Sequence, residues 1–101
     1  MAYSTVALSS DWSMIDHFAP SWRDVLYTLQ NMPKGEHSLD QIMEEYESQY
    51  DRKIPFVILS QVVNVLEVEG FVTFRRTKER GSLQKYVQIT EKGKNFKLEY
   101  I

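Results

Sequence analysis

The chain has 101 residues, 43% hydrophobic and 13% aromatic, which is enough to bury one hydrophobic core. It contains no cysteine, which excludes disulfide bonds, zinc sites built on thiolates and a cysteine nucleophile. No segment reaches the roughly 18 apolar residues of a membrane span, and the N-terminus lacks the pattern of a secretory signal, so we expect a cytoplasmic protein without a membrane partner.

The net charge of −2 conceals an uneven distribution along the chain. Residues 1–70 contain 4 Lys or Arg against 11 Asp or Glu, whereas residues 71–101 contain 8 against 3. Local basic patches, rather than the overall charge, attract the phosphates of nucleic acids. The C-terminal third could therefore bind a polyanion, and an unevenly charged solvated surface is the alternative interpretation.

The first 20 residues are weakly patterned. Ser10 or Asp11 could cap a short helix that reaches Phe18, and Pro20 would break it. We expect residues 1–20 to form an N-terminal segment, with a possible short helix and a contact to a second subunit. Residues 21–101 are the predicted folded domain.

Two amphipathic helices are predicted next. Ser21 is the expected N-cap of the first, with Asp24 as the acid of a capping box, and Pro33 and Gly35 end the helix. Its apolar stripe has the spacing i, i+3, i+4, i+7 and consists of Trp22, Val25, Leu26 and Leu29.

The second helix has the clearest pattern, because Ser38 and Gln41 form a capping box at its start. Its inward stripe is Leu39, Ile42, Met43, Tyr46 and Tyr50, and a separate acidic face consists of Asp40, Glu44, Glu47 and Asp51. Such a face is usually solvated surface rather than a paired-carboxylate site. In a DNA-binding protein it must point away from the DNA.

A third helix is predicted between Pro55, which suits a first turn, and Gly70, which suits a C-terminal stop. Its β-branched run could also form a strand, but its length and the glycine favour helix. The expected inward residues are Ile58, Leu59, Val62, Val65 and Leu66, and the expected polar side is Ser60, Gln61, Asn64 and Glu67.

After Gly70 the apolar period changes to two. Residues 71–76 and 83–89 are predicted strands, joined by the polar segment TKERGS, in which Gly81 can form a tight turn. The resulting hairpin carries Arg75, Arg76, Lys78, Arg80 and Lys85 against the single acid Glu79. Thr90 is expected to cap a short last helix.

Three helices followed by a basic hairpin predict an α+β fold, a winged helix-turn-helix with a three-helix core and a C-terminal β-hairpin wing. The sequence also resembles the MarR and PadR families of transcriptional regulators between Ser21 and Phe96. The shared pattern is a helix ending in Leu66-Glu67 and Gly70, an aliphatic strand at Val72, a basic wing, and Ile89 to Gly93. The resemblance implies a transcriptional regulator that binds double-stranded DNA. In a winged helix, a helix enters the major groove and the hairpin lays its cations along the neighbouring backbone or minor groove.

Ten residues are the predicted DNA contacts. The base readers on the third helix are Phe56, Val57, Ser60, Gln61 and Asn64, and the phosphate contacts on the wing are Arg75, Arg76, Lys78, Arg80 and Lys85. Gln and Asn can pair with adenine, and apolar side chains can touch the thymine methyl group. The third helix contains no Lys or Arg, so the commonest contact to guanine is missing and sequence reading should be modest or biased towards A·T pairs.

We expect a homodimer, because one such domain covers too few base pairs for strong specificity. Members of both families usually carry long dimerisation helices that this sequence does not contain after the wing. The expected interface is therefore the N-terminal segment from Tyr3 to Phe18, the C-terminal tail, or both.

The alternative function is a protein–protein interaction module in an assembly complex, for which Phe56, Val57, Val63 and Val68 would form the contact surface. The net acidic chain and the absence of Lys and Arg from the third helix favour this alternative, and the basic wing opposes it.

The sequence does not predict an enzyme. His17 and His37 lack the spacing of zinc ligands, and neither a nucleophile elbow nor a glycine-rich phosphate loop occurs. We therefore expect no catalytic residues, metal or cofactor. The aromatic residues fit a core best, although Trp12 and Trp22 could line a ligand crevice at a dimer interface.

Overall fold

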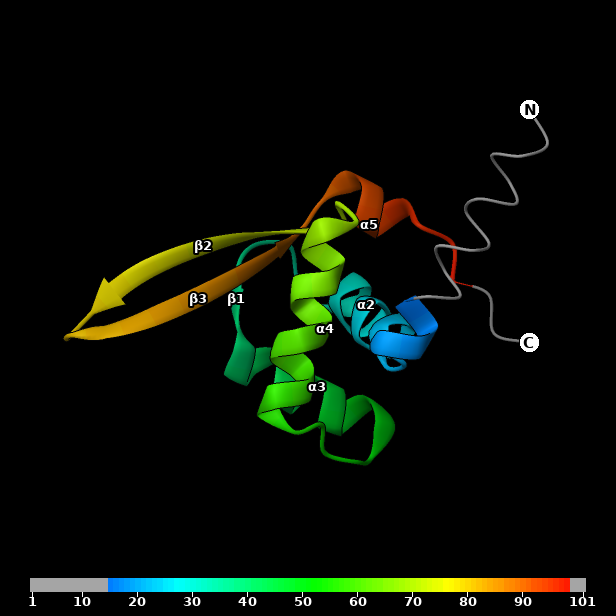
Figure 1. The fold of residues 1–101 in the computed structure, drawn as a ribbon, viewed down its shortest axis with the longest axis horizontal. Coiled ribbons are helices and arrows are strands. Elements are labelled where there is room, and N and C mark those ends of the chain that lie inside the picture. The colour runs from blue at the N-terminus through cyan, green and yellow to red at the C-terminus, as the bar shows by residue number, and fades with distance from the viewer. Residues whose placement is uncertain (1–14, 99–101) are drawn as a thin grey trace.

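A group of packed helices and a three-stranded sheet form the fold in the computed structural model, which describes residues 15–98 (Figure 1). The elements are α2 (Trp22–Asn31), β1 (His37–Ser38), α3 (Leu39–Tyr50), α4 (Phe56–Val68), β2 (Val72–Glu79), β3 (Ser82–Ile89) and α5 (Glu91–Asn95). Residues 15–18 are also helical. The predicted α+β winged helix-turn-helix is confirmed, with the β2–β3 hairpin as its wing.

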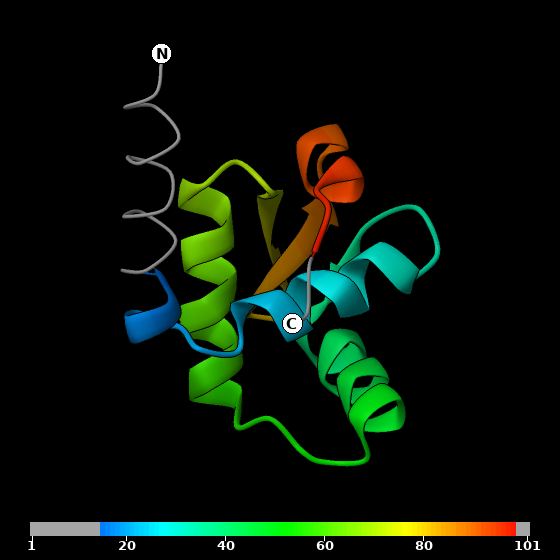
Figure 2. The ribbon, with the colours of Figure 1, turned by 90° about the vertical axis from the view of Figure 1, so that its right-hand side faces the viewer.

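The wing extends away from the helices. Figure 1 shows β2 and β3 projecting well past α4, and in Figure 2, turned by 90°, the hairpin lies behind the helices. Helix α2 packs against both α3 and α4, while α4 also contacts β2 at the root of the wing. The root of the wing is therefore held by the core, and the end with the turn lies farthest from the helices (Figure 1).

The helix starts follow the capping residues in part. Ser38 accepts a hydrogen bond from the Gln41 backbone at 3.2 Å, and Ser38 donates its own backbone N–H to the Gln41 side chain at 2.8 Å, which confirms that capping box. Ser21 does occupy the N-cap of α2, but its side chain makes no capping hydrogen bond. The predicted second capping box is wrong, since the Asp24 carboxylate accepts a hydrogen bond from Arg52 at 2.9 Å instead.

Gly70 ends α4 as predicted. Its φ of 81° is in the left-handed region, its N–H donates to the Glu67 carbonyl, and the Phe71 N–H donates to the Leu66 carbonyl. This pair of bonds is the Schellman motif, which closes a helix and reverses the chain. It leads directly into β2, so that Phe71 and Val72 are fully buried.

The predicted apolar face of α4 is confirmed in part, since Leu59, Val62 and Leu66 are buried as expected. Leu59, Val62, Val63 and Leu66 are the fully buried residues of this helix. Val65 is only partly buried, and Ile58, which was predicted to face inward, is 39% exposed. Val63, predicted for an exposed protein-contact surface, is 0% exposed. Both predictions are wrong because the buried residues follow i, i+3, i+4, i+7 from Leu59, which leaves Ile58 on the flank.

The strands of the wing are longer than predicted. Four of the six residues in the segment TKERGS belong to β2 or β3, since Lys78 pairs with Leu83 and Glu79 with Ser82. Only Arg80 and Gly81 form the turn, and their φ values of 52° and 81° are both positive. This is the type I′ geometry that suits the twist of a two-residue hairpin. The predicted six-residue connection is therefore wrong, and the tight turn at Gly81 is confirmed.

The sheet has the order β1-β3-β2 and is antiparallel. The two-residue strand β1 pairs with β3 through His37 and Val87, so His37 lies in a short edge strand. Strand β1 leads directly into α3, which ties the sheet to the helical core.

Gly93 explains the end of the Ile-Thr-Glu-Lys-Gly motif. A Cβ at this buried position would lie 2.2 Å from the carbonyl oxygen of Phe71, so only glycine fits. Thr90 caps α5 by accepting from the Gly93 N–H at 3.1 Å, and its hydroxyl donates to the Gly70 carbonyl at 2.7 Å. The motif therefore docks α5 against the turn between α4 and β2.

Trp22 belongs to this part of the core and is 1% exposed. Its ring stacks on Phe71 at a centroid distance of 6.2 Å, and its indole N–H donates to Asp16 at 2.7 Å. The suggestion that Trp22 lines a ligand crevice is wrong for this reason, and Trp12 lies outside the described residues.

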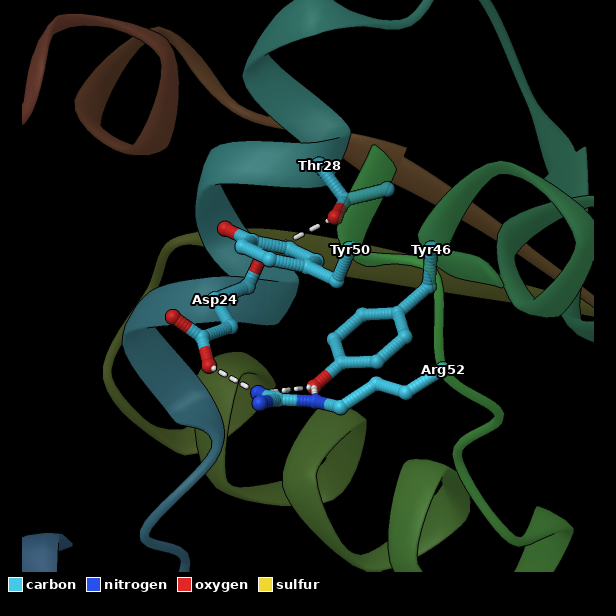
Figure 3. A network of polar contacts seen from close by, with 5 residues as sticks. All are labelled: Asp24, Thr28, Tyr46, Tyr50 and Arg52. Carbon is cyan, nitrogen blue, oxygen red and sulfur yellow. Dashed lines mark hydrogen bonds and ion pairs between the residues drawn. The ribbon is translucent and has the colours of Figure 1, made fainter. Parts of the chain in front are cut away.

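A polar network joins α2, α3 and the connection to α4 (Figure 3). The Arg52 guanidinium donates to the buried Tyr46 hydroxyl at 2.9 Å and to the Asp24 carboxylate at 2.9 Å. The hydroxyls of Thr28 and Tyr50 both donate to the backbone carbonyl of Asp24. The network joins the start of α2 to the end of α3 and to the connection that leads into α4.

Candidate nucleic-acid interface

The predicted base readers form an exposed strip on α4. Val57 is 72% exposed and Phe56 52%. Gln61 and Asn64 are also exposed, and Ser60 is half-buried. Val57, Gln61 and Asn64 follow i, i+4, i+7, which places them on one side of the helix. Since the buried side of α4 packs on α2 and β2, this strip faces away from the core.

The wing presents two different faces. Strand alternation places Phe74, Arg76 and Lys78 on the face that also carries Val72, which is buried against the core. Their partners Lys85 and Leu83 on β3 share this face, which we call the inner face. The inner face meets the exposed strip of α4 at Lys85, midway along the wing.

Lys85 connects the inner face of the wing to the exposed strip of α4. Its Nζ donates to the Asn64 side-chain oxygen at 3.1 Å and lies 4.0 Å from the centroid of the Phe74 ring. The Arg76 guanidinium lies 5.9 Å from the same ring. Burial, and then the neighbouring charge of Arg76, lower the pKa of Lys85, although the Glu67 carboxylate opposes the shift. A phosphate placed here would relieve the repulsion between the two cations.

A small groove of about 130 Å³ lies farther along the same surface. Phe56 lines it from α4 and Leu83, which is 77% exposed, from the wing, together with Ser38, Leu39, Asp40, Gln84 and Lys85. Asp40 belongs to the acidic face that was predicted to point away from DNA, so this face is not wholly turned away. Glu44 and Glu47 line a different groove with Met43 and Ile54.

Arg75 is the predicted phosphate contact that the structure separates from the others. It lies on the outer face of the wing, opposite the inner face, where it binds the Glu36 carboxylate and stacks over Tyr86. The hydrogen bonds from Arg75 hold the pKa of Glu36 below its ordinary value. Sequence reasoning missed Glu36 and Tyr86, since no local pattern links Glu36 to a residue 39 positions away.

Lys78 and Arg80 are the cations of the wing with the fewest side-chain interactions. Both are exposed, and neither has a side-chain hydrogen bond or ion pair with any residue between 15 and 98. They lie in the outer half of the hairpin, and Arg80 forms part of its turn.

Residues 15–98 contain neither a cluster of metal ligands nor a helix suited to a membrane span. Between residues 15 and 98, no group of three or more His, Cys, Asp or Glu could hold a metal ion. Over the same range, no helix has both the length and the apolar character needed to cross a bilayer. His37 Nε2 lies 2.7 Å from the Pro33 carbonyl oxygen, a contact within its own loop.

No protein-family model matches the sequence, and no curated protein matches it. Among solved structures, the chain is similar to a PadR family transcriptional regulator from Eggerthella lenta DSM 2243, with a TM-score of 0.57 and 17% sequence identity. The match covers 92% of this chain and 77% of that one. The winged-helix domain described above is therefore the fold of a PadR family structure.

Proposed function

We propose that this protein binds double-stranded DNA and regulates transcription. The observation that carries the proposal is the continuous surface formed by the exposed strip of α4 and the cationic inner face of the wing, joined by the bond from Lys85 to Asn64. A helix of this size fits the major groove, and a basic hairpin beside it suits the adjacent backbone. The similar fold of a protein named a transcriptional regulator supports the proposal.

Base reading is assigned to α4. Gln61 and Asn64 would pair with adenine, Ser60 would donate to or accept from a base edge, and Phe56 and Val57 would contact thymine methyl groups. Asn64 is bound to Lys85 in the free protein. A DNA phosphate can take over Lys85 and leave the Asn64 amide to a base, so the two contacts would form together.

Phosphate binding is assigned to Arg76, Lys78, Arg80 and Lys85. Arg75 is left out of this set because the Glu36 carboxylate already neutralises it on the outer face. We further propose that the active form is a homodimer whose interface lies in the N-terminal segment. Phe18, at its described end, is 61% exposed.

The test is fluorescence anisotropy of labelled random duplex DNA at low salt, followed by selection of bound sequences from a random pool. We expect binding by the wild type and weaker binding by a variant with Lys78 and Arg80 replaced by Ala. No binding to any duplex at tens of micromolar protein would overturn the proposal. That result would favour the protein-interaction alternative, for which Phe56, Val57 and Leu83 offer exposed apolar surface.

A further inference from the structure

The outer face of the wing carries an ion pair that reaches across the sheet. Arg75 Nε lies 2.8 Å from Glu36 Oε2 and 3.0 Å from Oε1, and Nη2 lies 2.9 Å from Oε1. The guanidinium also lies 4.9 Å from the centroid of the Tyr86 ring. The Tyr86 hydroxyl in turn donates to Glu79 at 3.2 Å. A planar fork that binds both carboxylate oxygens and stacks on a ring has a fixed direction, unlike a simple contact between charges.

This pair joins the two parts of the fold that must be aligned on DNA. Arg75 lies on β2 and pairs with Tyr86 on β3, which in turn pairs with Ser38 on β1. The Arg75 side chain therefore passes over β3 to reach Glu36, two residues before Ser38. Glu36 directly precedes β1, and Ser38, the last residue of β1, is the N-cap of α3, so the segment that carries Glu36 is connected directly to a helix of the core. The contact between Lys85 and Asn64 ties the inner face of the wing to α4, and Arg75 ties the outer face to the body.

We propose that Glu36 and Arg75 are positioning residues for DNA binding, which hold the wing at a fixed angle to α4. The proposal rests on the function proposed above. It has an unusual consequence, because an acidic side chain would then strengthen the binding of a polyanion.

Whether DNA affinity rises or falls when Glu36 is replaced separates a positioning role from simple charge repulsion. Removing a carboxylate from a DNA-binding protein should strengthen binding slightly, because less charge repels the phosphates. Glu36→Ala removes the same charge but also frees the wing. If the aligned wing then makes up about a fifth of the population, the apparent affinity falls about fivefold. Glu45→Ala is the matched control, since Glu45 is an exposed carboxylate of α3 without an ion pair among residues 15–98.

The reversed pair provides a rescue. Combining Glu36→Arg with Arg75→Glu keeps the net charge and restores an ion pair, so affinity should return towards that of the wild type. Arg75→Lys keeps the charge but loses the fork and the stacking, so it should weaken binding as Glu36→Ala does. Thermal unfolding should hardly change in any of these variants, because both side chains are partly exposed.

A second measurement needs no DNA. The chain lacks cysteine, so nitroxide labels can be attached at Ser82→Cys, beside the wing turn, and Ser48→Cys, on an exposed position of α3. The distribution of distances between the labels should broaden when Glu36→Ala is added and stay unchanged with Glu45→Ala.

Weaker DNA binding by Glu36→Ala with a broadened distribution supports the proposal. Equal or tighter binding by Glu36→Ala, or an unchanged distribution, overturns it. If the wild type binds no DNA, the proposed function fails, and the label distances alone then decide whether this ion pair holds the wing.

Discussion

Replacing Lys78 and Arg80 with Ala tests whether the wing contacts DNA phosphates. Both side chains are exposed on the outer half of the hairpin and have no ion pair within residues 15–98. Each lost phosphate contact should flatten the plot of log affinity against log salt by about 0.9, so the double variant should lose about 1.8 from the slope for each domain bound. Between 50 and 200 mM salt, the affinity of one bound domain should then fall about twelvefold less in the variant than in the wild type.

The assay is a salt titration by fluorescence anisotropy, on selected and on random DNA. Binding should weaken about equally on both, because phosphate contacts carry no sequence information. Lys34→Ala combined with Lys97→Ala is the matched control, since it removes two exposed cations from outside the proposed surface and should leave the slope unchanged. Equal slopes for wild type and the wing variant would refute the reasoning, as would equal flattening by the control.

Three further outcomes are expected. Gly93→Ala should destabilise the fold by about 3 kcal/mol in urea unfolding, because its Cβ would overlap the Phe71 carbonyl oxygen. Tyr46→Phe should cost about 1 kcal/mol in the same assay, since the buried hydroxyl that accepts from Arg52 is lost. Replacing thymine by deoxyuridine in a selected duplex should weaken binding about fourfold per contacted methyl group, and Val57→Ala should reduce this difference if Val57 is a reader.

The local signals in the sequence were sufficient for the order of the elements. The caps formed by Ser38 and Thr90 and the helix end at Gly70 each use a bond to a residue three positions away, so these roles could be predicted without the tertiary structure. The two-residue turn was harder to predict. Polar Lys78 and Glu79 look like loop residues, but on an exposed hairpin nothing requires a strand to be apolar.

The face of α4 could be predicted only in part from its own pattern, which placed Leu59, Val62 and Leu66 correctly but not Ile58 and Val63. The run from Phe56 to Leu59 is apolar at every position, so a period of 3.6 fits more than one orientation. Packing against α2 and β2 selects Leu59 and Val63 as inward residues and leaves Phe56 and Val57 exposed. Exposing apolar side chains in the first turn of α4 to water is unfavourable for the free protein. It is better explained by a partner that contacts it than by folding alone.

The partner of Arg75 also could not be predicted, because it lies far away in the sequence. Alternation along β2 places Arg75 on the face opposite Phe74, but the pairing with Glu36 arises only once β1 adds to the edge of β3. A cation on a hairpin therefore indicates a phosphate contact only when its own face is free of carboxylates. Arg76 meets this condition better than Arg75, since its described contacts on the inner face are with the Phe74 ring and the cation Lys85.

The number of available cations bears directly on the proposed dimer. With Arg75 neutralised by Glu36, one domain offers Arg76, Lys78, Arg80 and Lys85, which predicts a salt slope of about 3.6. Two domains on adjacent half-sites would double it to about 7. We therefore expect a slope near 7 on a selected palindromic duplex and near 3.6 on a duplex with one half-site. Light scattering of the complex should give two chains per palindrome. A slope near 3.6 on both duplexes, with one chain bound, would show that the domain binds as a monomer and that the dimer proposal is wrong.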